Sequence, residues 1–188
     1  MFRKLALAAL IALFAPTVSA DDAATRTIGP AIGSPAPATT LKTYTNTPMS
    51  LNDLSGDKGL VLVFFRSASW CPFCKKQLAE LQGAEADLAD WGWQLAGVSY
   101  DSPEILASFA ETTGLSYPLL SDADSTTIRN FDLLNDDVDP DSRAYGIPHP
   151  AIVFIDSSGV VVSVLQEEGY RNRPQVETVL ATADALTQ

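Results

Sequence analysis

Two unbroken apolar runs dominate the hydrophobic pattern of the chain. The runs are Leu60–Phe65 and Ala151–Ile155, and both are rich in residues that favour strands. Neither run alternates with polar residues, which is typical of a strand that is buried on both faces of a sheet. Shorter runs predict three more strands, over residues 94–100, 117–120 and 160–166, the last of which follows a hairpin turn at residues 156–159.

Between the predicted strands, the spacing of apolar residues changes to that of helices. Residues 72–90 place apolar side chains at helical intervals, with Lys, Glu and Gln between them. Ser102, Pro103 and Glu104 open a second helix, which runs to Thr113 and ends at Gly114. Two more helices are predicted over residues 125–133 and 174–186. Strands and helices thus alternate before a final hairpin and helix, which predicts an α/β fold with a mixed central β-sheet flanked by helices on both faces.

The first twenty residues have the pattern of a secretory signal peptide. A basic start at Arg3 and Lys4 precedes the apolar run of residues 5–15, and Val18 and Ala20 occupy the −3 and −1 positions of an A-x-A-like cleavage site. The run is shorter than the roughly 20 residues that span a bilayer, although an uncleaved anchor is the alternative. We therefore expect cleavage after Ala20, export to a periplasm or similar space, and no membrane attachment of the mature chain.

The remainder of the chain is expected to form one domain. Residues 21–31 are expected to be a flexible lead-in, because prolines, glycines and small residues are concentrated there, and residues 32–188 would form the domain. With 46% hydrophobic and 19% charged residues, such a chain can bury a sizeable core. The full 188-residue sequence has 23 acidic and 12 basic residues and a net charge of −11, which excludes nucleic acid and anionic membranes as partners.

The candidate chemistry lies in the segment that follows the first buried run. Two cysteines, Cys71 and Cys74, flank Pro72, and Pro is favoured at the first position of a helix. Cys71 would then be the N-cap, with its sulfur accepting hydrogen bonds from N–H groups at the positive end of the helix dipole. Both effects favour the thiolate, which is the nucleophilic form. The spacing predicts that Cys71 attacks and that Cys74, on the same face, resolves the mixed disulfide.

Other interpretations of the two cysteines remain open. A structural disulfide is possible in an exported protein, although a bridge across four residues removes little entropy from the unfolded chain. Cys71, Cys74 and the single histidine, His149, provide only three ligands for a metal. Structural zinc requires four, whereas two thiolates and one imidazole suit copper(I) better. The redox interpretation requires no metal and no cofactor.

These residues carry a family resemblance. Residues Val61–Leu78, VLVFFRSASWCPFCKKQL, resemble the active-site strand and helix of the thioredoxin superfamily, and Tyr145–Asp156 resembles its proline-containing segment before a strand. The resemblance extends from Ile32 to the C-terminus and includes the long insert of the redoxin branch, the alkyl-hydroperoxide-reductase/thiol-specific-antioxidant (AhpC/TSA) proteins. It implies a thioredoxin-like fold in which Pro150 is a cis proline that faces the dithiol.

At several positions this chain lacks the residues that peroxiredoxins and thioredoxin use for their activity. Peroxiredoxins carry Pro-x-x-x-Thr-x-x-Cys, and this chain has Ser67, Cys71 and Cys74 at those three positions. Peroxiredoxins also have an arginine where Pro150 stands, for which Arg171 or Arg173 is a possible substitute. The buried aspartate of thioredoxin is absent as well, because its position holds Phe65.

Two side chains beside the motif are further candidates. The resemblance implies that His149, which precedes Pro150, faces the dithiol; as an imidazolium it would stabilise the Cys71 thiolate and tune the redox potential. The alternative is an ordinary surface or packing histidine. Trp70 is expected to shield the sulfur and offer contact surface, or to pack in the core.

The sequence therefore predicts an exported thiol–disulfide oxidoreductase that uses the Cys71–Cys74 dithiol. Its partners would be a protein thiol or disulfide, or a small hydroperoxide, together with an external reductant. Two alternatives remain: a peroxiredoxin-like thiol peroxidase with antioxidant activity, and a copper(I) chaperone that binds through Cys71, Cys74 and His149.

Overall fold

A computed structural model describes residues 28–169 and 171–188, so the expected signal peptide and residues 21–27 lie outside the described part of the chain. The strands are β1 (Thr40–Thr43), β2 (Pro48–Ser50), β3 (Gly59–Phe64), β4 (Trp93–Ser99), β5 (Leu119–Ser121), β6 (Ala151–Asp156) and β7 (Val161–Leu165). The helices are α1 (Leu51–Leu54), α2 (Pro72–Gln82), α3 (Glu85–Asp90), α4 (Pro103–Thr113), α5 (Thr126–Asn130) and α6 (Val176–Thr187).

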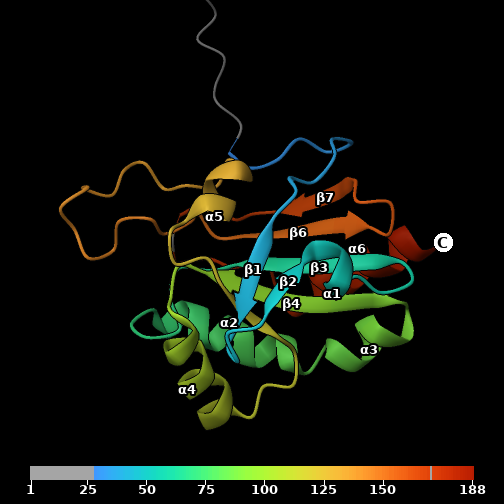
Figure 1. The fold of residues 1–188 in the computed structure, drawn as a ribbon. Coiled ribbons are helices and arrows are strands. Elements are labelled where there is room, and N and C mark those ends of the chain that lie inside the picture. Colours follow the sequence, from blue (N-terminus) through green and yellow to red (C-terminus); the bar gives the residue numbers. More distant parts are fainter. Residues whose placement is uncertain (1–27, 170) are drawn as a thin grey trace, which may run out of the picture.

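The described strands form one mixed sheet in the order β2-β1-β5-β4-β3-β6-β7 (Figure 1). β3 lies near the middle, parallel to β4 and antiparallel to β6. The six residues of β3 are all buried, which confirms the prediction of a strand covered on both faces. The hairpin that joins β6 to β7 is also confirmed.

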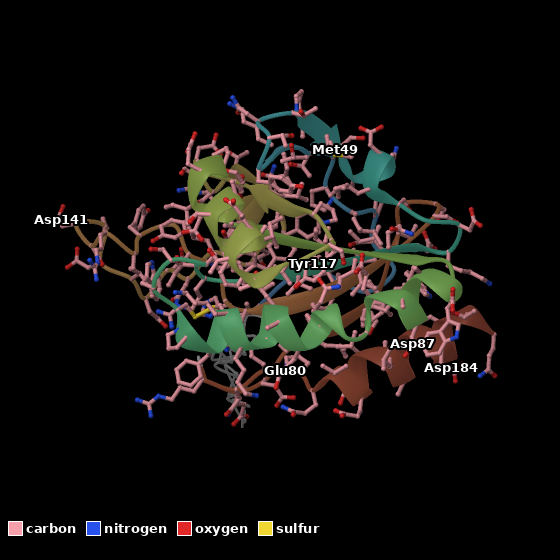
Figure 2. The ribbon with its side chains drawn as sticks, turned by 90° about the horizontal axis from the view of Figure 1, so that it is seen from below. Met49, Glu80, Asp87, Tyr117, Asp141 and Asp184 are labelled. Carbon is pink, nitrogen blue, oxygen red and sulfur yellow. A yellow bond between two sulfur atoms is a disulfide. The ribbon has the colours of Figure 1, made fainter. Side chains whose placement is uncertain are left out.

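Alternate residues of β3 pack into two separate cores. Val61 and Val63 lie in a cluster with side chains of α2, α3, α4 and α6, whereas Leu62 and Phe64 lie in a second cluster with side chains of α1 and α5. Figure 1 shows α2, α3 and α4 together on one side of the sheet, and Figure 2 shows α6 on that side as well. Helices therefore cover both faces, as the element order predicted.

The single helix predicted over residues 72–90 is wrong, because the structure has two helices there. α2 ends at Gln82. The N–H of the next residue, Gly83, donates to Glu80 O (3.1 Å), and Ala84 N–H donates to Leu81 O (3.0 Å). These bonds to the third preceding residue tighten the last turn and redirect the chain into α3. The apolar spacing continues through the break because Leu81 and Leu88 face the same core.

Other helix and strand boundaries follow the sequence signals more closely. α4 begins at Pro103 and ends before Gly114, which has the left-handed backbone conformation (φ 68°) expected of a helix-terminating glycine. The expected helix over residues 125–133 is shorter, at Thr126–Asn130. No prediction covered β1, β2 or α1, although Ser50 and Asp53 form a capping box at the start of α1.

The segment that follows the expected lead-in pairs with the start of β7. Gly33 N–H donates to Val161 O (2.7 Å), and Val161 N–H donates to Ser34 O (2.9 Å), while Pro35 and Val160 form an antiparallel bridge. Among the residues that the structure describes, no helix has the length and apolar character needed to cross a bilayer.

Candidate active site

The dithiol lies at the N-terminal end of α2, where Cys71 and Cys74 form a disulfide (Figure 2). Cys71 is the N-cap and Pro72 is the first helical residue, as predicted. The backbone N–H of Cys74 donates to Cys71 Sγ at 3.2 Å. Both side chains are buried: Cys71 is 2% exposed and Cys74 is 0% exposed. The pair is therefore held beside the positive end of a helix dipole and largely out of water.

The loop between β3 and Cys71 is held by a buried carboxylate that the sequence analysis did not identify. Asp101, just beyond β4, accepts hydrogen bonds from Ser67 Oγ at 2.8 Å and from Ala68 N–H at 2.6 Å. Ser67 Oγ in turn accepts from Ser69 N–H at 3.0 Å. Burial raises the pKa of Asp101, and these hydrogen bonds oppose that effect. The sequence does contain a signal for Asp101. Ser99 and Asp101 are polar residues at and just beyond the end of β4, the strand that pairs with β3 before the cysteines.

Trp70 makes two directional contacts next to the disulfide. The guanidinium carbon of Arg66 lies 5.0 Å from its ring centroid, which is a cation–π distance. Its Nε1–H donates to the Tyr100 hydroxyl at 3.0 Å, and that hydroxyl donates to Arg143 O at 3.2 Å. Trp70 also packs against the core that contains both cysteines. The packing role is therefore supported, whereas shielding of the sulfur by Trp70 stays a prediction.

Arg173 brings a positive charge to both sulfurs. Its Nη2 lies 3.5 Å from Cys74 Sγ and 4.0 Å from Cys71 Sγ, and the residue is only 9% exposed. Burial, with a smaller contribution from the charge of Arg66, lowers the pKa of Arg173 to about 10. The guanidinium thus stays protonated at neutral pH. Of the two arginines that the sequence offered as substitutes, Arg173 is the one that these contacts place at the dithiol.

His149 and Pro150 lie in the segment that leads into β6. Together with Arg66 they line a pocket of about 550 Å³. The backbone N–H of His149 donates to Leu133 O at 2.7 Å. All described peptide bonds are trans, so the expectation of a cis Pro150 is wrong. An X–Pro bond favours trans unless its surroundings select cis, and Pro150 has this ordinary isomer.

The copper alternative has no geometric support. The described residues contain no group of three or more His, Cys, Asp or Glu side chains placed to hold a metal ion. Cys71, Cys74 and His149 are therefore not brought together as a ligand set. A role for His149 in redox tuning stays a prediction.

A second pocket, of about 510 Å³, lies beside α2 and the segment before α6. Arg173 and Gln77 are part of its lining, together with Phe73 and Pro174. Because the guanidinium of Arg173 also contacts the sulfurs, this pocket is adjacent to the dithiol. A cysteine pair with a buried cation can undergo two-electron oxidation to the disulfide and reduction back to two thiols.

Comparison with known proteins gives one family. The model of the AhpC/TSA family matches residues 32–164. Peroxiredoxin Bcp of Escherichia coli K12 is 30% identical over 135 residues, which cover 72% of this chain and 85% of that protein. A relative in Mycobacterium tuberculosis is 39% identical over 92 residues, and this match spans only 57% of that protein's length.

Solved structures share the fold. The crystal structure of peroxidoxin BcpB from M. tuberculosis superposes with a TM-score of 0.70 at 25% identity, covering 86% of this chain and 97% of that one. Peroxiredoxin Q of Xanthomonas campestris has a TM-score of 0.67 at 23% identity, covering 80% and 92%. The chain has a thioredoxin-like fold, as the sequence predicted.

Proposed function

Because the chain belongs to the AhpC/TSA family, we propose that its Cys71–Cys74 dithiol reduces hydroperoxides and is then regenerated by an external thiol. As a member of this family, the protein is a thiol-dependent oxidoreductase. The observation that carries the choice of a hydroperoxide is the contact of Arg173 with the sulfurs of Cys71 and Cys74, residues that are 2% and 0% exposed. A buried cation stabilises a thiolate, and a buried sulfur favours a small oxidant over a folded protein.

The proposed cycle uses both cysteines. The Cys71 thiolate attacks one oxygen of the hydroperoxide: an S–O bond forms, the O–O bond breaks, and the leaving oxygen takes a proton to become an alcohol or water. Cys74 then attacks the sulfenic sulfur of Cys71, so that the disulfide forms and water leaves. Two external thiols reduce the disulfide and become a disulfide themselves.

The N-cap position supports Cys71 as the attacking thiol. Its sulfur accepts the Cys74 N–H as the N-cap of α2, whereas Cys74 lies within the first turn and is fully buried. Arg173 Nη2 lies nearer to Cys74 Sγ, where it stabilises the negative charge of that sulfur when a reductant opens the disulfide.

Exchange with a protein disulfide is the second candidate function. The Cys-Pro-Phe-Cys segment at the start of a helix supports it, since this is the arrangement that the sequence analysis associated with thiol–disulfide exchange. It requires the surface of a folded protein to reach Cys71, which is 2% exposed, whereas a hydroperoxide is a small molecule.

Single-turnover assays distinguish the two. The fully reduced protein is mixed with hydrogen peroxide or cumene hydroperoxide, and separately with the disulfides of insulin. We expect one disulfide formed per hydroperoxide consumed and much slower reduction of insulin. Cys74→Ser should accumulate a sulfenic acid at Cys71, and Cys71→Ser should not consume peroxide. Faster reduction of insulin than of either peroxide would favour the second candidate, and activity in Cys71→Ser would exchange the roles of the cysteines.

We further propose that the protein is exported, with cleavage after Ala20. The support is the basic start, apolar run and small residues of positions 1–20, and a redox pair suited to an oxidising compartment. Expression of the full chain in a Gram-negative host, followed by fractionation and N-terminal sequencing, tests this. A periplasmic product that begins at Asp21 is expected, whereas a full-length chain in the cytoplasmic fraction would contradict it.

A further inference from the structure

Three backbone N–H groups precede Cys71 in the loop that leaves β3, and side chains rather than backbone carbonyls accept hydrogen bonds from them. Asp101 Oδ2 accepts from Ala68 N–H at 2.6 Å. Ser67 Oγ accepts from Ser69 N–H at 3.0 Å and from Trp70 N–H at 3.5 Å. Ser67 and Asp101 therefore bind the backbone of the loop from Ala68 to Trp70.

Asp101 and Ser67 are themselves fixed. Ser67 is 0% exposed and Asp101 is 4% exposed, and Ser67 Oγ donates to Asp101 Oδ1 at 2.8 Å. Ser99 Oγ donates to Asp101 Oδ2 at 3.1 Å, and Asp101 N–H donates back to Ser99 Oγ at 3.2 Å. A buried carboxylate with this many donors has one orientation, so the residues that it holds have one orientation as well.

We propose that Asp101, acting through Ser67 and Ala68, is a positioning residue that holds Cys71 at the N-cap of α2. Asp101 touches neither sulfur in the contacts described above. It fixes the path of residues 67–70, and that path determines whether Cys71 Sγ lies where the Cys74 N–H and Arg173 Nη2 reach it. The inference deepens the proposed function because it takes Cys71 as the attacking thiol.

Positioning and direct electrostatics predict opposite effects for Asp101→Asn. If the carboxylate acted on the thiol through its charge, removing that charge would make the thiolate more stable. If it acts by positioning, the asparagine amide has one acceptor oxygen where the carboxylate has two, so it cannot accept from both Ser67 Oγ and Ala68 N–H on separate oxygens; the loop loosens, and the thiolate becomes less stable. Ser67→Ala separates the effects further, because it removes the hydroxyl that joins Asp101 to Ser69 N–H and Trp70 N–H and keeps the carboxylate.

The test measures the rate of iodoacetamide alkylation of the reduced, full-domain protein against pH, with the labelled cysteine identified by mass spectrometry. In Asp101→Asn and Ser67→Ala, we expect the midpoint pH for alkylation of Cys71 to rise by about one unit, a tenfold fall in thiolate at low pH. Ser67→Thr keeps the hydroxyl and should stay near the parent. Because alkylation needs neither a hydroperoxide nor a protein disulfide, the result is independent of which substrate the protein uses.

Asp122 provides the matched control. It is also buried, at 5% exposure, and accepts two backbone N–H groups, from Thr127 at 3.0 Å and from Ile128 at 2.8 Å, at the start of α5. Asp122→Asn should lower the midpoint of urea unfolding and leave the alkylation midpoint unchanged. If Asp101→Asn does not fold, the alkylation midpoint of Ser67→Ala alone tests the proposal. An unchanged or lower alkylation midpoint in Ser67→Ala or in folded Asp101→Asn overturns the proposal, as does an equal rise in Asp122→Asn.

Discussion

The groups that contact the two sulfurs come from distant parts of the chain. Cys74 N–H is local, but Arg173 Nη2 is contributed by a residue 99 positions away from Cys74. Arg173 is 9% exposed and lies in the segment that joins β7 to α6. A buried hydrogen bond to a charged group contributes about 1.5–3 kcal/mol, so this one residue has a measurable share in the reactivity of the dithiol.

Arg173→Met removes the charge and keeps an unbranched side chain. We expect the rate constant for hydroperoxide reduction to fall by about 10- to 100-fold, which is the range of that hydrogen-bond energy. Stopped-flow measurement of the reduced protein checks this. Arg171→Met is the control, because Arg171 is an exposed residue of the same segment. Equal losses in both variants would show that the segment as a whole, and not the contact with sulfur, is responsible.

Asp122 gives a prediction for the pH dependence of stability. Burial raises its pKa above the ordinary 3.8, in spite of hydrogen bonds from Ile128 and Thr127 N–H. The folded state therefore holds the proton to a higher pH than the unfolded state. Its contribution to stability is complete below pH 3.8 and is lost as pH rises through the folded pKa. The free energy of unfolding of the parent minus that of Asp122→Asn should thus decrease from pH 4 upward in urea titrations; an increase would contradict the raised pKa.

At the residue scale, the sequence predicted those features of the site that depend only on neighbouring residues. Pro72 after Cys71 is enough to place a helix start, and with it the N-cap sulfur. Arg173 could be named but not placed, because its contact depends on how the chain folds back from β7. Asp101 was missed because its hydrogen bonds to residues 67 and 68 form only when β3 and β4 pair in parallel.

At the scale of elements, the hydrophobic pattern does not reveal a helix break that leaves the apolar spacing unchanged. Apolar spacing alone extends one helix through residues 72–90, and the break at Gly83 leaves that spacing intact. Short elements escape prediction for the opposite reason: β1 has four residues, and its exposed–buried alternation is too brief to distinguish from a loop. Long buried strands such as β3 were predicted because every residue contributes to the same signal.

Two glycines are expected to respond in opposite ways to alanine. Gly83 is exposed, has right-handed helical angles (φ −69°, ψ −21°), and an added Cβ would lie 3.4 Å from Glu80 O. Gly83→Ala should raise the free energy of unfolding by about 0.4–1 kcal/mol, because it restricts the unfolded chain. Gly59→Ala should destabilise strongly, since φ is 149° and the Cβ would lie 2.1 Å from Ile155 O. Urea unfolding measures both, and a destabilised Gly83→Ala would mean that the α2–α3 break needs glycine.

At the scale of the whole molecule, the fold brings two segments that are far apart in the sequence to one redox centre. The cysteines follow β3, whereas Arg173 precedes α6, whose buried Val179 and Ala183 lie in the same core as Cys71 and Cys74. The sequence predicted this mixed sheet with helices on both faces, since element order limits the arrangements available. It could not predict which loops meet at the end of α2, because that depends on twist and packing.

This arrangement couples redox state to global stability. Folding brings the Cys74 N–H and the Arg173 guanidinium to the sulfurs, and these groups favour thiolate over disulfide sulfur because they are positive. The unfolded chain provides neither. Folding should therefore stabilise the reduced protein more than the oxidised protein, and the thermodynamic cycle makes the folded disulfide more oxidising than an unfolded one by the same free energy.

We accordingly predict that the reduced protein unfolds at higher urea than the oxidised protein at pH 7. The difference in unfolding free energy should be about 1.5–3 kcal/mol if one charged hydrogen bond dominates. It should shrink in Arg173→Met, whose disulfide should also show a lower reduction potential, by about 30 mV for each ~1.4 kcal/mol lost. Urea titration of both redox forms and equilibration with a glutathione or dithiothreitol couple provide the two numbers independently. Greater stability of the oxidised form would mean that the contacts of Arg173 hold the disulfide, not the thiolate, and would remove the electrostatic basis for a reactive Cys71.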